Sequence, residues 1–130
     1  MIIGKALLAE VRKRAEESPR LRMNFNFHEG PEAGAQRLIN SLLPGTEIPV
    51  HRHPHTSETY ILLDGHLRVD FYDEEGRIAE SFDLCAGSPA FGVHIPKGQW
   101  HGMEVIEPSS IFEVKDGPYT PITPDNILSK

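Results

Sequence analysis

The beginning of the chain carries the spacing of an amphipathic helix. Leu8, Val11 and Ala15 recur at steps of three and four residues, so they fall on one face of a helix. Pro19 cannot continue such a helix and marks the end of the pattern. The sequence therefore predicts a helix over residues 5–17.

The pattern then changes to strict alternation. In "RLRMNFNFH", the polar side chains of Asn24, Asn26 and His28 alternate with Phe25 and Phe27, which is the period of a β-strand. On an edge strand the phenylalanines face inward and the polar set faces water. In a barrel, the same polar set can face the barrel mouth.

Short apolar runs separated by turn residues follow. Further strands are predicted at 37–43, 47–53, 58–63, 66–72, 77–84, 90–95, 99–105 and 110–115. Pro44-Gly45 and the hairpin tip "DEEG" are among the turn signals between them. Many short strands with no helix between them favour an all-β fold, either a sandwich or a barrel.

Composition narrows the class of protein. A chain of 130 residues is long enough for one hydrophobic core, so we expect a single domain. The net charge of −6 argues against nucleic acid or an anionic membrane as a partner. The single cysteine, Cys85, cannot form an internal disulfide, and no run reaches the ~18 apolar residues of a membrane span. We therefore expect a cytoplasmic protein.

Histidines and a glutamate stand close together in "HRHPHTSE". With a period of two, His51, His53 and His55 point to the same side of a strand. Pro54 has no N–H to donate to a ladder, so we expect the chain to turn before Glu58 begins the next strand. Imidazoles and a carboxylate on neighbouring strands can converge on one metal ion, whose bonds to nitrogen and oxygen are about 2.0–2.2 Å long.

Two further histidines flank a turn in "HIPKGQWH". Pro96 fixes φ at the entry of this turn, and Gly98 permits a positive φ. His101 then stands at the start of the outgoing strand, while His94 precedes the turn. His101 is the fourth ligand candidate.

These segments resemble the two motifs of the cupin superfamily. The first motif is matched in spacing at Gly45, His51, His53, Glu58 and Gly65. The second is matched in its Pro-x-Gly-x-x-His element by "PKGQWH", but Ala90 and Val105 stand where that motif has glycine and asparagine. The metal ligands implied by this resemblance are His51, His53, Glu58 and His101.

The whole chain resembles, more narrowly, the WbuC-type cupin-fold metalloproteins. The likeness lies in "SPRLRMNFNFH", "QRLINSLLPGT", "HRHP", "FGVHIPKGQWH" and "FEVKDGPY". It implies a helical segment over residues 1–22 and a double-stranded β-helix barrel over 23–130 that holds one divalent metal. These are small bacterial proteins associated with surface-polysaccharide gene clusters, so the resemblance implies a role in polysaccharide biosynthesis without assigning a reaction. It also implies that two copies can associate as a homodimer.

The ligand set leaves several functions open. Three histidines and one carboxylate, without a thiolate, suit Fe, Mn, Ni, Zn or Cu and leave one or two positions for water or substrate. The protein could be an enzyme, such as a metal-dependent isomerase, lyase or dioxygenase, acting on a sugar or sugar-nucleotide. It could instead be a module that anchors a carbohydrate or carboxylate ligand without turnover, or a barrel in which the metal is structural. An open coordination position in a polar cavity favours the first two.

Further polar residues are candidates for roles beside the metal. The candidates for proton transfer are His28, Tyr60 and His94. The candidates for substrate binding are Asn24, Asn26, His28 and Gln36. Alternatively, these side chains join the N-terminal segment to the barrel through backbone hydrogen bonds. The alternative for the ligand histidines is a set of surface side chains that titrate near pH 6.5. His55 is expected at the barrel mouth or in solvent.

Overall fold

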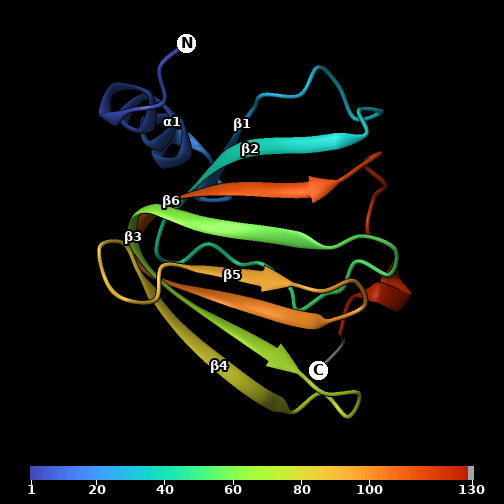
Figure 1. The fold of residues 1–130 in the computed structure, drawn as a ribbon. Coiled ribbons are helices and arrows are strands. Elements are labelled where there is room, and N and C mark those ends of the chain that lie inside the picture. Colours follow the sequence, from blue (N-terminus) through green and yellow to red (C-terminus); the bar gives the residue numbers. More distant parts are fainter. Residues whose placement is uncertain (129–130) are drawn as a thin grey trace.

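The computed structural model describes residues 1–128 and shows a helix followed by antiparallel strands (Figure 1). The elements are α1 (Lys5–Glu17), β1 (Arg22–Asn26), β2 (Ala35–Leu42), β3 (Glu58–Tyr72), β4 (Ile78–Cys85), β5 (Gly92–Ile95), β6 (Trp100–Asp116) and the short 3-10 helix η1 (Pro124–Asn126). The predicted all-β class with a short N-terminal helix is confirmed. Within residues 1–128, no helix combines the length and the apolar character needed to cross a membrane.

Helix α1 covers one edge region of the sheet. Its apolar face buries Val11 and Ala15 against β1 and β2. The helix ends where Ser18 takes up an extended conformation, just before Pro19. The guanidinium of Arg12 also contacts the carboxylate of Asp64 on β3 at 2.8 Å. Figure 1 shows α1 beside β1 and β2, away from β4.

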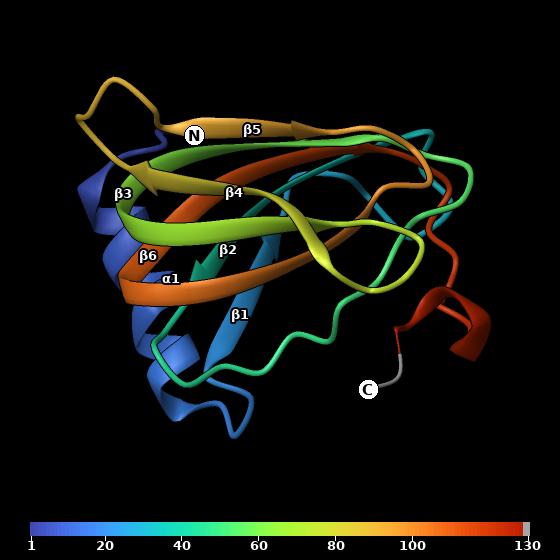
Figure 2. The same cartoon turned by 90° about the horizontal axis from the view of Figure 1, so that it is seen from below.

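Two long strands build both layers of the barrel. The sheet order is β1-β2-β6-β3-β4, and β5 pairs with β3. Residues 58–61 of β3 pair with β5, whereas residues 66–72 of the same strand pair with β4. Strand β6 follows β3 along nearly its whole length. Because both strands bend, the sheet curves around an interior (Figure 2).

Gly65 makes the bend in β3 possible. Its φ is +95°, in the left-handed region that favours glycine. A Cβ atom at this position would collide with the backbone of Pro108 and Ser109, where β6 bends alongside. The two bent strands can therefore approach closely only because Gly65 has no side chain.

The structure differs from the predicted strand list at these bends. The predicted strands 58–63 and 66–72 form one strand, β3, and 99–105 and 110–115 form one strand, β6. Gly65 and Pro108 lie in the gaps between these predicted strands, but the strands continue through them with shifts in register. These shifts are β-bulges or irregularities, which bend a strand without ending it.

The predicted strand at 47–53 was wrong. In this segment His51 forms isolated bridges with His101 and Ile127, and its neighbours make no ladder within the described part of the chain. Pro49 and Pro54 explain the difference, because neither has an N–H to donate.

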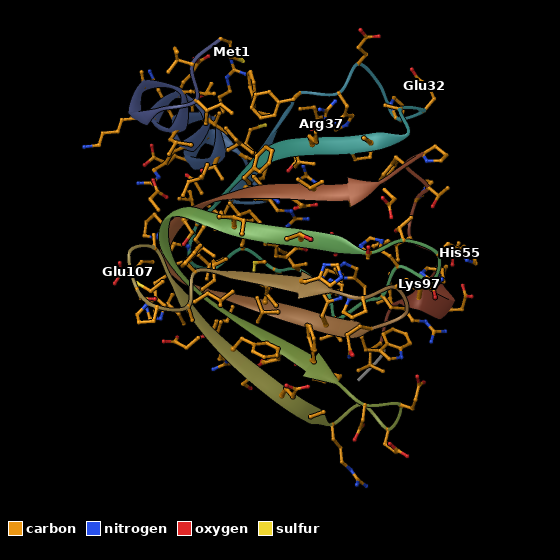
Figure 3. All side chains as sticks on the ribbon, viewed as in Figure 1. Met1, Glu32, Arg37, His55, Lys97 and Glu107 are labelled. Atoms are coloured by element: carbon orange, nitrogen blue, oxygen red, sulfur yellow. The ribbon has the colours of Figure 1, made fainter. Side chains whose placement is uncertain are left out.

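Apolar side chains fill the interior of the barrel. The buried cluster consists of Leu42, Tyr60, Leu62, Leu67, Val69, Phe71, Leu84, Ile95, Val105 and Ile111. Figure 3 shows Glu107 at the end of the barrel where β3 and β6 bend, and His55 and Lys97 at the opposite end. Because His53 and His101 lie close in sequence to His55 and Lys97, the histidine-rich segments meet toward that opposite end.

Candidate metal centre

Four side chains from three segments converge inside the barrel. His51 and His53 come from the segment before β3, Glu58 is the first residue of β3, and His101 is the second residue of β6. Each offers one ligand atom, and these four atoms lie within 4.8 Å of one another. The structure thus brings together the four residues that the cupin resemblance implied as ligands.

Backbone hydrogen bonds fix the positions of the histidines. The amide of His51 donates to the carbonyl of His101 at 3.0 Å, and the amide of His101 donates to the carbonyl of His51 at 2.9 Å. The carbonyl of His53 accepts from the amide of Gly98 at 2.8 Å, within the turn that precedes β6. The irregular segment is therefore attached to the strand and turn that present His101.

The same local contact orients two of the imidazole rings. Nδ1 of His51 lies 2.8 Å from the carbonyl oxygen of Pro49, and Nδ1 of His101 lies 2.9 Å from that of Gln99. A carbonyl can only accept, so each Nδ1 carries the hydrogen and donates it. Nε2 is then the ring nitrogen left free for another partner, which is the arrangement of metal-bound histidines.

Glu58 lies between two of the rings. Its Oε1 is 3.1 Å from Nε2 of His101 and 3.3 Å from Nε2 of His53. Oε1 of Glu58 and Nε2 of His101 are both fully buried and make no aligned hydrogen bond among the described residues. Buried polar atoms without such partners are costly, and a cation between them would satisfy both. The donor set therefore fits a metal ion.

The electrostatics favour the ligating forms. Burial lowers the pKa of His51 to about 4, and the neighbouring His101 acts in the same direction. Burial alone would raise the pKa of Glu58, but its contacts with His101 and His53 hold that pKa well below the ordinary value. At neutral pH His51 is therefore an uncharged imidazole and Glu58 is a carboxylate.

The four side chains face a cavity of about 360 Å³, hereafter the metal cavity. Such a volume lies in the range of small-molecule sites. Polar and charged side chains share its lining with the four candidate ligands; they include Arg20, Arg22, Asn40, Tyr60, Glu113 and Lys115. The site is therefore reachable by a ligand and is not enclosed in a dry core.

The sequence profile of one family matches residues 3–84, and its description is "Domain of unknown function (DUF6016)". The chain belongs to this family. A comparison with curated proteins finds no match.

Solved structures with a similar fold include TT1209 from Thermus thermophilus, at 21% identity and a TM-score of 0.61, over 89% of this chain and 97% of that one. A cupin-2 domain-containing protein from Shewanella frigidimarina has 23% identity and a TM-score of 0.56, over 72% and 79% of the two chains. The cupin domain of Cnp3 from Schizosaccharomyces pombe has 15% identity and a TM-score of 0.59; the match covers 73% of this chain and 64% of that one. The DUF6016 chain therefore has the cupin fold.

One wall of the metal cavity in this DUF6016 protein was missed by the sequence analysis. Glu113 and Lys115 on β6 stand opposite Tyr60 and Glu58 on β3, so all four share the inward face. Burial, followed by the charge of Glu58, raises the pKa of Glu113 to about 7. Burial likewise raises the pKa of Tyr60 well above its ordinary value. The available signal was the alternation Ile111, Glu113, Lys115, which places both charged residues on the face of a buried isoleucine.

The candidate substrate-binding residues line a second cavity of the DUF6016 chain. This cavity, hereafter the polar groove, has a volume of about 440 Å³, and its lining includes Asn24, Asn26, His28 and Gln36. Nε2 of the Gln36 side chain donates to the carbonyl of Ala33 at 2.9 Å, and Nδ1 of His28 accepts from the backbone amide of Arg37 at 3.0 Å. His28 and Gln36 therefore also form hydrogen bonds with the local backbone.

The remaining histidines lie apart from the four candidate ligands. His94 is exposed on β5, and its Nδ1 lies 3.0 Å from the hydroxyl of Thr59, so the structure does not bring this candidate to the metal cavity. His66 contacts Asp83 at 2.6 Å near the bend of β3. His55 is exposed beside His53 and lines a small side cavity.

Proposed function

We propose that this protein holds one divalent transition-metal ion on His51, His53, Glu58 and His101 and applies it to a small polar ligand in the metal cavity. The observation that carries this proposal is the arrangement of donor atoms within 4.8 Å of one another. Two of the rings are also oriented by Nδ1–H donation to backbone carbonyls. A set of three imidazoles and a carboxylate suits iron, manganese, nickel, zinc or copper.

The accessible cavity supports a role for the metal beyond stabilising the barrel. A bound ion in such a site can polarise a carbonyl, lower the pKa of bound water or hold a vicinal diol. His51, Glu58 and His101 are buried, and all four candidate ligands line the metal cavity. The surrounding chain therefore shields the candidate ligands from bulk water, and the metal cavity leaves room for a ligand beside them.

Tyr60 and Glu113 are placed to act on a ligand in this cavity. Both are less than a tenth exposed, and both line the metal cavity on adjacent strands. The hydroxyl of Tyr60 stays protonated because its pKa is raised, so it is a hydrogen-bond donor at neutral pH. Of the three residues named for proton transfer, Tyr60 lines the metal cavity, His28 lines the polar groove and His94 lies on the outside.

The finer proposal is a WbuC-type cupin that acts on a sugar or sugar-nucleotide in surface-polysaccharide biosynthesis. Its support is the resemblance of motifs along nearly the full chain, together with the polar groove beside the metal cavity. An isomerase, lyase or dioxygenase reaction fits a metal with an open position, and so does binding without turnover.

The metal assignment is tested by a matched pair of histidine variants. His101→Ala removes a buried candidate ligand, whereas His94→Ala removes an exposed imidazole on the outer face. We expect His101→Ala to weaken metal affinity by roughly 100-fold or more, and His94→Ala to leave it unchanged. Elemental analysis and competition with a chelator measure the affinity, and circular dichroism checks the strands. Equal metal retention by the two variants would falsify the assignment.

Catalysis and simple binding are separated by a second measurement. The metal-loaded protein is incubated with sugars and sugar-nucleotides, and each compound is followed by thermal shift and by product analysis. Product formation that depends on the ion supports the enzyme. A thermal shift without product supports the binding module.

A further inference from the structure

Lys115 is a largely buried cation without a hydrogen-bond acceptor in the described part of the chain. Its side chain is 18% exposed, and it projects from β6 between Glu58 on β3 and Gln36 on β2. The nearest carboxylate oxygen, Oε2 of Glu113, is 3.7 Å from its Nζ, which is beyond hydrogen-bond distance. An ammonium group has three hydrogens to donate, and those of Lys115 are left for an acceptor in the cavities that its side chain lines.

Lys115 also stands where three cavities meet. Together with Tyr119 it lines the metal cavity, the polar groove and the small side cavity next to His53 and His55. Nζ lies 5.8 Å from the centre of the Tyr119 ring. A ligand that extends from the metal cavity into the polar groove must therefore pass this ammonium group.

The balance of charges around the metal cavity differs in sign from the net charge of the whole chain. The chain has a net charge of −6. The metal cavity, in contrast, is lined by three cationic side chains, those of Arg20, Arg22 and Lys115, and by two carboxyl groups. One of these carboxyl groups is the candidate ligand Glu58, whose charge a divalent ion would more than cancel. The loaded cavity is therefore electropositive and attracts anions.

The polar groove supplies hydrogen-bonding groups for the rest of a ligand. Asn24 and Asn26 are exposed along one of its walls, and Asn24 also lines the metal cavity. On the neighbouring strand, Oδ1 of Asn40 is buried without a hydrogen-bond partner among the described residues. Amides of this kind bind hydroxyl groups through paired donors and acceptors.

We propose that the ligand of this site is a small hydroxylated anion, such as a sugar acid or a sugar phosphate, whose carboxylate or phosphate is bound by Lys115. This inference rests on the proposed metal function for the position of the other end of the ligand. The anionic group accepts hydrogen bonds from the ammonium, and the hydroxyl groups lie toward the ion and toward the amides of Asn24 and Asn40.

The test compares three compounds of similar size on the metal-loaded protein: glucose, glucuronate and glucose 6-phosphate. We expect at least one anion to bind ten or more times more tightly than glucose, as measured by calorimetry. The carboxylate and the phosphate are separate arms, so the preferred anionic group is identified. Equal binding of all three compounds, or binding of none, overturns the proposal.

Variants of Lys115 show whether this side chain is responsible. Lys115→Met keeps the length of the side chain and removes its charge, and Lys115→Arg keeps the charge. Lys13→Met removes one charge from the exposed face of α1 and is the matched control. We expect Lys115→Met to weaken anion binding tenfold or more, with binding largely retained in the other two variants. Equal anion affinity in Lys115→Met and Lys13→Met overturns the proposal.

Metal content separates this proposal from the one on which it rests. Each variant is analysed for bound metal after reconstitution, and we expect all of them to retain it, because Lys115 is not among the four ligands. If the unsubstituted protein takes up no metal, the metal function fails, and the same three compounds are tested on the metal-free form. Preferential anion binding that still depends on Lys115 would then support the inference on its own.

Discussion

At the scale of single residues, the site depends on one contact that occurs twice. His51 and His101 each donate from Nδ1 to the carbonyl two residues earlier in the chain, that of Pro49 and that of Gln99. This contact uses backbone groups, so it orients the rings without any further side chain. It leaves Nε2 of both rings free to bind a metal ion.

Glu113 is expected to lower the stability of the metal-free protein above neutral pH. Its pKa is raised from 4.5 to about 7, so the folded state binds more protons than the unfolded state between these values. The contribution of Glu113 to stability is therefore fully present below about pH 4.5 and is lost as the pH rises through 7. We expect Glu113→Gln to gain on the order of 2–3 kcal/mol at pH 8 relative to pH 4.5.

Urea unfolding in the presence of a chelator measures this difference. Glu80→Gln, which changes an exposed carboxyl on β4, serves as the control and should behave like the unsubstituted protein at both pH values. A Glu113→Gln variant with the same gain at pH 4.5 and at pH 8 would count against a titrating carboxyl.

The candidate ligands were predictable from the sequence, but their surroundings were not. His51, His53, Glu58 and His101 stand at motif spacing, so a local pattern was enough to find them. Lys115 is far from these motifs in sequence. Its position depends on the pairing of β6 with β3, and a shift of one residue in that pairing would have placed its side chain outside.

At the scale of elements, the barrel depends on strands that bend without ending. The sequence predicted separate strands on either side of Gly65 and of Pro108, and the structure shows one continuous strand at each place. The signal for a turn and the signal for a bend are the same residue types, glycine and proline. Tertiary pairing decides between them, and a single sequence does not reveal it.

Gly65→Ala is expected to destabilise the barrel strongly. The substitution strains a residue at φ +95° and drives a methyl group into the backbone of Pro108 and Ser109. We expect a loss of about 2–4 kcal/mol in the free energy of unfolding. Gly87→Ala is the matched control, because Gly87 has φ +79° and open space around it, so it should lose only about 1 kcal/mol.

Urea unfolding of the two variants gives the comparison. The difference between their free energies of unfolding gives the cost of the steric collision, because both variants place an alanine at a positive φ. Equal losses in the two variants would show that the bend tolerates a side chain.

At the scale of the whole molecule, the candidate metal centre brings together segments that are far apart in the chain. The segment with His51 is held on one side by β6 and on the other by the C-terminal segment, since the amide of Leu128 donates to the carbonyl of Val50 at 2.8 Å. Figure 2 shows this C-terminal segment beside the segment that precedes β3. The all-β class was predictable from the pattern of apolar and polar residues, whereas these contacts between distant segments were not.

A metal ion should therefore stabilise the fold as a whole. An ion present at 100 times its dissociation constant adds about 2.7 kcal/mol if it binds the folded state alone. For a chain of 130 residues this corresponds to a rise in Tm of roughly 10 °C. Calorimetry with each of iron, manganese, nickel, zinc and copper, against a chelator-treated sample, measures the effect. His101→Ala should show no rise, and an unchanged Tm with all five ions would contradict a bound metal.

The alternation along β2 separates side chains that line the barrel interior from side chains on the opposite face of the strand. Gln36, Leu38 and Asn40 face the interior, while Arg37 and Ile39 face the other way. Substitutions at every second residue of β2 can therefore alter which ligand the barrel binds while the packing beneath α1 is preserved. Relatives with the same architecture can in this way differ in the ligand that they bind while each keeps a stable fold.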